Sequence, residues 1–365
     1  MTQPRTEATR TKVGLTALAI ALVALVALTF LPTPYVIQKP GPVYNTLGTA
    51  LDADGEEIPL IQIDDAETFP TEGALDLTTV QVVGSRERPV SWFELALAWV
   101  DSSKAVVPIE SVFPEGVTRE QREQRNSMLM VDSQHEATAA ALRQLGEEVP
   151  ATISVVEVLD DGASAGLLEA DDQITEIDGV AVSDMDALRA KIQEAEGKAV
   201  ALTVVRDDEE QTVTVTPQKR EANGTTTWLI GVTLMLEYEF PIDVTLQLNN
   251  VGGPSAGLMF ALGIIDVLTP GELNGGETVA GTGTINGLGD VGPIGGIRQK
   301  LYGARDAGAT YFFAPEANCA EVVGHVPDGL QVVKTATLDD ALDALEVIAE
   351  GGDVADLPTC TAAAK

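Results

Sequence analysis

A run of 19 residues without a charged side chain, from Val13 to Leu31, is the feature that most restricts how this chain can fold. As an α-helix this run would be roughly 28 Å long, about the thickness of the hydrocarbon core of a bilayer. Pro32 and Pro34 follow the run and would end the helix. We therefore predict a transmembrane helix at residues 13–31.

Charge is distributed unevenly around this run. The 365-residue chain has a formal net charge of −34; residues 1–12 hold three basic and one acidic side chain, whereas the rest sums to −36. Because basic residues collect on the cytoplasmic side of a membrane helix, we expect residues 1–12 to be cytoplasmic and the chain after residue 32 to be extracytoplasmic. The alternative is a cleaved signal peptide, but Thr29 to Pro32 lacks the small residues of a cleavage site.

The composition argues against several classes of function. An acidic surface repels phosphate, and only 4% of the residues are aromatic, so no nucleic-acid partner is expected. Two Cys and two His are too few for a Cys/His zinc site and limit any mechanism that needs a catalytic His, so neither a metal nor a cofactor is expected. Cys319 and Cys360 could form a disulfide outside the cytoplasm or remain unpaired thiols.

The remaining chain predicts an α+β protein. Residues 32–146 form a linker and a β/α region, in which residues 74–83 alternate like a strand and residues 118–145 read as a capped helix. A separate unit is predicted at residues 147–219, then a domain at residues 220–348 and a tail at residues 349–365. The separate unit is expected to contain strands at residues 152–159, 199–206 and 211–215, and a helix at residues 184–195.

The motifs of the separate unit resemble those of a bacterial PDZ domain. They are V-x-x-V-x-x-x-G-A-S-A-G-L from Val155, then D-D-Q-I-x-x-I-D-G, a helix, and R-D-D-E-E between the closing strands. The resemblance implies that a peptide adds as a strand beside the second strand and the helix. The carboxylate-binding loop of the family would precede Ile153, but Glu147 and Glu148 there would repel a terminal carboxylate. The alternative is a PDZ-like spacer or lid.

Ser255 lies in Gly253-Pro254-Ser255-Ala256-Gly257, before an apolar run at residues 256–268 that predicts a buried helix. Taken alone, Ser255 would be the N-cap of this helix. The motif also fits G-x-S-x-G, the nucleophile elbow of α/β-hydrolases, and Asp290 or Asp306 with His325 could complete a triad. Two observations oppose that reading, because only 110 residues follow the serine and no βα alternation precedes it.

A lysine is the candidate base for this serine. A helix is predicted after Gly295-Gly296, and in helical projection Lys300 falls within the arc of Leu301, Ala304 and Ala307. A lysine is usually exposed, but one that faces a core has a lowered pKa, so that its neutral amine can take a proton from a serine. Ser-Lys pairs are a known variant of the nucleophile and base arrangement.

These motifs together resemble the proteolytic domain of Lon, the serine-lysine peptidases of family S16. The matching words are G-P-S-A-G at residues 253–257, T-G-T-I-N-G-L-G-D-V-G-P-I-G-G at residues 282–296, and I-R-Q-K at residues 297–300. An anchor, a PDZ domain and such a domain resemble the membrane-anchored Lon-like proteases of Gram-positive bacteria. The resemblance implies that Ser255 is the nucleophile, Lys300 the general base and Thr282 a partner of the lysine, with Gly253, Pro254 and Gly257 in support.

The chain also departs from the Lon pattern. Several Lon enzymes have an acid where this chain has Gly252 and another where it has Thr284, and no G-x-x-x-x-G-K-[ST] motif for ATP is present. Residues 128–145 resemble the V-M-K-E-S-A-Q-A-A helix near the start of the Lon proteolytic fold. The PDZ-like unit would then be inserted into the protease fold.

The sequence therefore predicts an ATP-independent serine endopeptidase that cleaves unfolded or exposed segments of extracytoplasmic or membrane proteins. Its expected partners are peptide or unfolded protein substrates and the membrane, and the Lon resemblance implies a homo-oligomer, a hexamer in that family. The alternative is a catalytically idle, membrane-anchored PDZ scaffold or holdase. The neutral residues Gly252 and Thr284 in place of acids favour this alternative.

Overall fold

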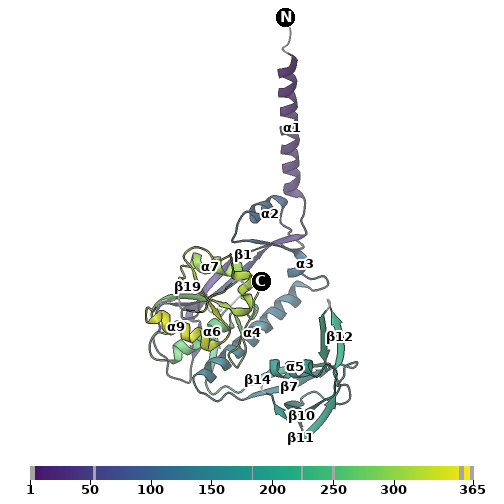
Figure 1. The fold of residues 1–365 in the computed structure, drawn as a ribbon, viewed down its shortest axis with the longest axis vertical. Helices are drawn as coiled ribbons and strands as arrows, with labels where there is room; N and C mark the ends of the chain where they lie inside the picture. The colour runs from purple at the N-terminus through teal and green to yellow at the C-terminus, as the bar shows by residue number, and fades with distance from the viewer. Residues whose placement is uncertain are drawn as a thin grey trace.

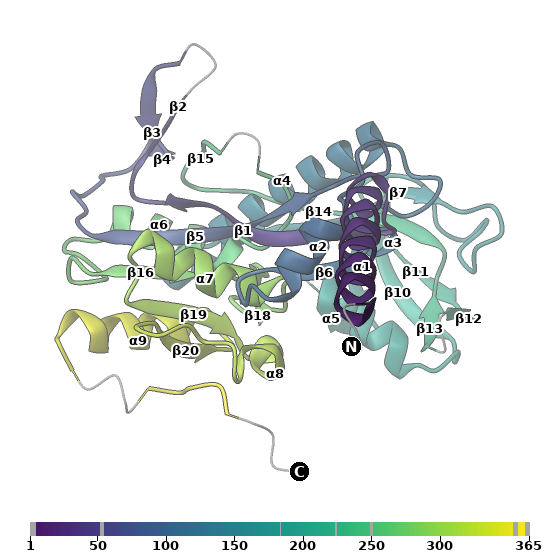
Figure 2. The same ribbon diagram turned by 90° about the horizontal axis from the view of Figure 1, so that it is seen from above.

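The structure is a computed structural model that describes residues 5–51, 55–182, 184–222, 225–248, 251–352 and 357–361. It contains a long N-terminal helix, a large mixed sheet with helices on both faces, and a smaller antiparallel sheet (Figure 1). The fold is thus of mixed α+β type, as predicted. Figure 2, which looks down the N-terminal helix, shows the two sheets side by side.

Helix α1 (Arg5–Phe30) contains most of the predicted apolar helix and ends before Pro32, as expected from the missing N–H of proline. In Figure 1 it stands away from the rest of the molecule. A membrane-spanning helix must keep an apolar surface over the whole hydrocarbon core. Over the described residues, no helix has the combination of length and apolarity that this requires. The transmembrane assignment of residues 13–31 is therefore not supported.

Six strands form the large sheet, in the order β20-β19-β16-β5-β1-β6. Strand β1 pairs with β5 and β6 in antiparallel fashion, whereas β5, β16, β19 and β20 are parallel neighbours. The six strands are β1 (Tyr35–Asn45), β5 (Ala74–Val83), β6 (Ala105–Pro108), β16 (Thr278–Gly281), β19 (Tyr311–Pro315) and β20 (Gln331–Thr335).

Alternation along the strands produces a core on each face of this sheet. Successive side chains of a strand point to opposite faces, and Phe313 packs with Leu77 in one core while Phe312 packs in the other. The first core is covered by α4 (Arg119–Gln144), α6 (Gly257–Leu268) and α9 (Leu338–Ala349). The second is covered by α7 (Ile297–Ala307) and α8 (Cys319–Val322). Helices α6 and α7 therefore approach the sheet from opposite sides.

The smaller sheet has the strand order β11-β10-β8-β7-β14 and its own core, against which α5 packs. The predicted strands and helix of the PDZ-like unit are present, close to their expected bounds. These elements are β7 (Ala151–Val158), β8 (Gln173–Ile177), β9 (Val180–Ala181), α5 (Met185–Glu194), β10 (Val200–Arg206), β11 (Glu209–Val215) and β14 (Val232–Tyr238).

The expected position of the peptide groove in this unit was wrong. Strand β8, the second strand, has β10 on one side and β7 on the other, so neither of its edges is open to a peptide. The sheet ends in β11 on one side and in β14 on the other. Strand β14 follows the PDZ-like motifs in the sequence and pairs with β7. Because β14 lines a cavity together with α5, its outer edge is the one that could accept an additional strand beside the helix.

The large domain is built from chain segments on both sides of the PDZ-like unit. Strand β5 precedes the unit, and its first four residues, 74–77, pair with β16, which follows the unit. Strand β4 (Ile61–Ile63) likewise pairs with β15 (Val244–Leu246). This topology agrees with the hypothesis of an insertion, whereas the domain boundaries assigned from the sequence remain predictions.

The remaining elements are short, and one disulfide lies near the chain end. Cys319 at the start of α8 is bonded to Cys360, with an S–S distance of 1.99 Å. The other elements are β2 (Thr49–Leu51), β3 (Glu57–Pro59), α2 (Trp92–Trp99), α3 (Ile109–Val112), β12 (Gln218–Ala222), β13 (Thr225–Leu229), β17 (Thr284–Ile285), β18 (Val291–Gly292) and η1 (Glu316–Asn318).

The insertion predicts that residues 220–365 do not fold by themselves. Without β5, strand β16 loses a parallel partner, and the fully buried Leu75 and Leu77 leave the core. We expect this fragment to show no cooperative thermal transition by circular dichroism and to be digested rapidly by an added protease. Residues 32–365 serve as the control, and a stable, active 220–365 fragment would contradict the insertion.

Candidate active site

Ser255 lies in the loop that leads into α6. The helix consists of apolar residues and glycine apart from Asp266, and its residues from Gly257 to Asp266 are all buried, so the helix start is held firmly against the core. The N-cap of α6 is Ala256, which makes no side-chain capping hydrogen bond, so the simple reading of Ser255 as the N-cap was wrong. The hydroxyl of Ser255 is thereby available for a different partner.

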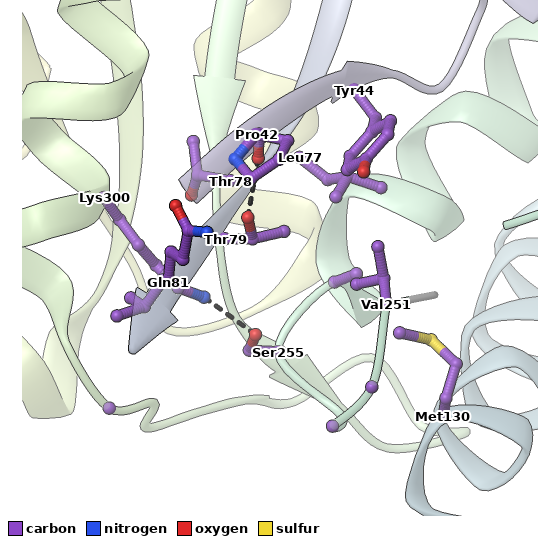
Figure 3. Close-up of a pocket in the computed structure, with 15 residues that line it drawn as sticks. Pro42, Tyr44, Leu77, Thr78, Thr79, Gln81, Met130, Val251, Ser255 and Lys300 are labelled. Atoms are coloured by element: carbon purple, nitrogen blue, oxygen red, sulfur yellow. Dashed lines mark hydrogen bonds between the residues drawn. The ribbon is translucent and has the colours of Figure 1, made fainter. Parts of the chain in front are cut away.

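That partner is Lys300, which α7 brings to the serine from the other side of the sheet. The side chain of Lys300 lies on the buried face of α7, as its spacing predicted, and the residue is 2% exposed. Its Nζ donates hydrogen bonds to Ser255 Oγ and to Thr282 Oγ1, each 2.7 Å long. Figure 3 shows the lysine and the serine pointing toward each other.

Burial changes the acid–base behaviour of this lysine. Desolvation disfavours the ammonium form and lowers the pKa of Lys300 from 10.5 to about 7. A large fraction of the amine is therefore neutral near pH 7. A neutral amine at hydrogen-bond distance from a hydroxyl can act as its general base.

Thr282 connects the lysine to the backbone of the serine. It follows β16, accepts the bond from Lys300 and donates from Oγ1 to the carbonyl oxygen of Ser255 at 2.8 Å. The N–H of Gly283 donates to the same carbonyl at 3.0 Å. These bonds fix the position of Ser255 relative to the end of β16.

Helix α4 supports the serine loop through residues that the sequence reasoning missed. Ser133 is 4% exposed and donates from Oγ to the carbonyl oxygen of Pro254 at 3.0 Å. The carbonyl of Asn126 accepts from the N–H of Gly253 at 3.2 Å. The predicted helix at residues 118–145 indicated that α4 would exist, but only its packing on α6 places these two residues at the loop.

The glycines around Ser255 have different roles. A glycine at position 252, 253 or 257 could let a substrate backbone approach closely, but two of these three glycines face the protein itself. A Cβ on Gly252 would lie 2.8 Å from Asn126 Cβ, and one on Gly257 would lie 2.9 Å from Ile285 Cγ2. Gly253 has a φ of 92°, which disfavours any side chain, and nothing lies within 4 Å of its missing Cβ.

Two hollows flank Ser255. The first, which we call the β5 hollow, has a volume of about 410 Å³ and is lined by β5 residues, Tyr44, Met130, Ser255 and Lys300 (Figure 3). The second, the hairpin hollow, has a volume of about 380 Å³ and lies beside the β17–β18 hairpin. Its lining residues are Pro254, Ser255, Thr284, Pro293, Ile294 and Gly295. Ser255 therefore lies where two cavities meet.

The alternative triad is not assembled. Asp306 forms an ion pair with Arg305, and His325 contacts the carbonyl of Val323 through Nδ1. Asp290 accepts from the side chain of Asn286. In the described part of the chain, no hydrogen bond joins any of these three side chains to Ser255, so the α/β-hydrolase reading fails because its acid and base lie elsewhere.

Comparisons with known proteins agree with this geometry. Residues 249–347 match the Lon protease (S16) C-terminal proteolytic domain, and residues 122–216 match the PDZ domain. Lon protease 1 of Bacillus subtilis (strain 168) is 29% identical over 189 residues, which cover 49% of this chain and 24% of that protein. Lon protease of Azospirillum brasilense is 34% identical over 116 residues, which cover 31% of this chain and 14% of that protein.

The solved PDZ domain of an SdrC-like protein from Listeria monocytogenes is 30% identical to the part of this chain that it matches. The match covers 22% of this chain and 85% of that domain, with a TM-score of 0.21. The matches span 24% or less of the length of the two Lon relatives. They cover the part of this chain that holds Ser255, Thr282 and Lys300. The chain therefore contains a PDZ domain and a Lon-type S16 proteolytic domain, which is the domain of a serine peptidase.

Proposed function

We propose that this chain is an ATP-independent serine endopeptidase with Ser255 as nucleophile and Lys300 as general base. The observation that carries the proposal is the 2.7 Å hydrogen bond between a buried amine and the serine hydroxyl. A lysine needs a lowered pKa to act as a base near neutral pH, and the burial of Lys300 provides it.

The geometry supports an acyl-transfer mechanism. The neutral amine of Lys300 takes the proton of Ser255 while Oγ attacks the carbonyl carbon of the substrate. Backbone N–H groups at the start of α6, at the positive end of its dipole, stabilise the oxyanion. The Lys300 ammonium then gives its proton to the leaving amine, which frees the first product and leaves an ester on Ser255. Water attacks this ester with the same proton relay and regenerates the serine.

Thr282 positions the base in this mechanism. Its hydroxyl accepts one N–H of the lysine and donates its own proton to the Ser255 carbonyl, so it holds the amine without removing the lone pair that must face Ser255. Since burial is what lowers the pKa of Lys300, no carboxylate is needed in the site. The neutral Thr284 and Gly252 are compatible with this arrangement.

Unfolded or exposed protein segments are the proposed substrates. The two hollows of about 410 and 380 Å³ on either side of Ser255 can accept side chains of an extended chain, whereas a folded domain would have to unwind first. The sequence has no G-x-x-x-x-G-K-[ST] motif, which supports cleavage without ATP. We include a homo-oligomer in the proposal because Lon relatives form rings.

The proposed location is extracytoplasmic, with the N-terminal segment as the anchor. The positive charge before the apolar run and the strong negative charge after it support this orientation. The Cys319–Cys360 disulfide supports an oxidising compartment. The anchor itself rests on the sequence alone.

Substitution of the two proposed catalytic residues should abolish cleavage. Ser255→Ala removes the nucleophile, and Lys300→Arg keeps a cation that cannot give up its proton. We expect each to lower kcat/KM on an unfolded protein by about 10³-fold or more. Lys191→Arg, an exposed lysine of α5, is the matched control. Equal cleavage by all four proteins, or none by the wild type, would favour the idle scaffold.

The titration of Lys300 should control both activity and stability. Cleavage should increase with pH through about 7, as the amine loses its proton. Because the folded-state pKa lies below the ordinary value of 10.5, the unfolded chain binds more protons between these values, and stability rises with pH across that window. Lys300→Met should therefore raise Tm over the wild type by more at about pH 6 than at about pH 9.5. Lys191→Met, at an exposed lysine, is the control substitution. A pH-independent difference for Lys300→Met would contradict a lowered pKa of Lys300.

The location can be tested in intact cells that express the full chain. A protease added outside the cell wall should digest it, and a membrane-impermeant maleimide should label its cysteines only after reduction, because they are disulfide-bonded. A cytoplasmic reporter protein must stay undigested in the same cells. Protection of the chain from the protease, with no labelling by the impermeant maleimide even after reduction, would place it in the cytoplasm.

A further inference from the structure

Helix α2 carries an exposed apolar face, which we call the α2 patch. It consists of Phe93, Leu97 and Trp99 of the helix and of Val100, the C-cap, and these residues are between 49% and 83% exposed. The only polar residue within α2 is Glu94. A helix that is apolar on all sides is normally buried, and a contiguous exposed apolar patch indicates a surface that binds a partner.

The opposite side of α2 is fixed to the proteolytic domain. Leu95 and Ala98 are buried, and they pack with Ile37 of β1 and with Val90. Helical geometry places these two α2 residues on the side away from Phe93. The α2 patch is therefore a rigid part of the domain surface, and substitutions in it leave the core packing of α2 in place.

The α2 patch lies beside the end of α1. The segment that follows α1 is joined to the segment that precedes α2, because Pro32 forms a β-bridge with Ser91 and Thr33 Oγ1 donates to the carbonyl oxygen of Val90 at 3.0 Å. Leu31 and the first turn of α2 line one cavity of about 430 Å³. Figures 1 and 2 both show α2 next to the lower end of α1. The exposed apolar surface of α1 thus continues onto α2.

The shape of this combined surface fits a bilayer better than it fits a protein partner. Apolar side chains are exposed on all sides of α1, including Leu15, Leu18, Ile20 and Val23, each more than 60% exposed. A protein partner covers one side of a helix, whereas lipid surrounds it. Because the apolar surface of α1 continues onto α2, the occupant that surrounds α1 also reaches the α2 patch.

The residue types around α2 fit the boundary between acyl chains and headgroups. Aromatic side chains, tryptophan above all, collect at this level of a membrane. Helix α2 holds Trp92 and Trp99, two of the three tryptophans of the chain. Arg88, in the loop before α2, is exposed and has no ion-pair partner among the described residues. Its guanidinium can therefore bind the phosphate of a lipid headgroup.

We infer that the α2 patch is a membrane contact, in which α2 lies in the headgroup region of a lipid bilayer beside the end of α1. The inference rests on the membrane location proposed above, but it uses a surface other than α1, so that either contact can fail without the other. Strand β1, on which α2 packs, pairs with β5, and β5 lines the hollow beside Ser255. Contact of α2 with lipid would therefore fix how the active site is oriented relative to the membrane.

A fluorescent label on α2 tests the inference in the full chain, reconstituted in phosphatidylcholine nanodiscs. Both native cysteines are disulfide-bonded, so Leu97→Cys introduces the only free thiol for an environment-sensitive dye. We expect lipids with a nitroxide near the headgroup to quench this label by about half or more. Val180→Cys, on β9 of the PDZ-like unit, is the matched control, because Val180 is 52% exposed and Leu97 53%. Its label should not be quenched.

A label at Leu18→Cys in α1 reports separately on the proposed anchor. Quenching at position 18 without quenching at position 97 would overturn the inference and leave the anchor intact. Quenching at position 97 alone would support the inference and overturn the anchor, and no quenching at either position would overturn both. A label at position 97 that is shielded from water but not quenched would show that a protein surface, such as a second copy, covers α2, and would overturn the inference.

Substitutions in the α2 patch provide a second test. Phe93→Ser with Val100→Ser, made in the Leu97→Cys chain, should reduce quenching at position 97 by about twofold or more, because they remove apolar area that enters the bilayer. Val180→Ser with Val326→Ser makes the same kind of change at exposed apolar positions outside the patch and should leave the quenching unchanged. Equal quenching in the two variants would overturn the inference. Neither measurement needs turnover, so a failure of the proposed peptidase would leave both results unaffected.

Discussion

The burial of one amine beside one hydroxyl is the constraint on which the rest of the site depends. Lys300 can be a base only if water is excluded from it, because a hydrated lysine stays protonated at neutral pH. Exclusion of water requires α7 to press its lysine against the end of β16, and reaction requires α6 to present Ser255 at the same point. The large sheet satisfies both conditions, since α6 and α7 pack on its opposite faces and meet beyond β16.

Helix α4 connects the loop that carries Ser255 with the junction between the two domains. Its residues Asn126 and Ser133 hold the loop before Ser255, and its residues Glu136 and Arg143 hold the junction between the PDZ-like sheet and the β17–β18 hairpin. All four residues thus lie within about five turns of one rigid helix. This arrangement gives the insertion of the PDZ-like unit a physical reason, because the unit begins directly where α4 ends.

Local patterns predicted much of the fold and most of the site. The strand at residues 74–83, the buried helix after Ser255 and the elements of the PDZ-like unit follow from alternation, helical spacing and turn residues. Ser255, Thr282 and Lys300 lie together, as the sequence motifs led us to expect. The spacing of apolar residues in the helix of Lys300 placed the lysine on the side that faces the core. The peptide groove was misplaced because an edge strand is defined by which strands pair with it, and β14 pairs with β7 from far along the chain.

The sequence by itself determined the local elements, the choice of Ser255 and Lys300 as the candidate nucleophile and base, and the charge that disfavours nucleic acid. These features depend on composition or on residues within a few positions of one another. Short-range steric effects and hydrophobic spacing can therefore be recognised directly in the sequence. Only the tertiary structure decided that β5 and β16 share a sheet across the PDZ-like unit, that Ser133 supports the serine loop, and that two cavities meet at Ser255. Contacts between residues more than 100 positions apart depend on how whole helices and strands pack, and local sequence patterns do not predict that packing.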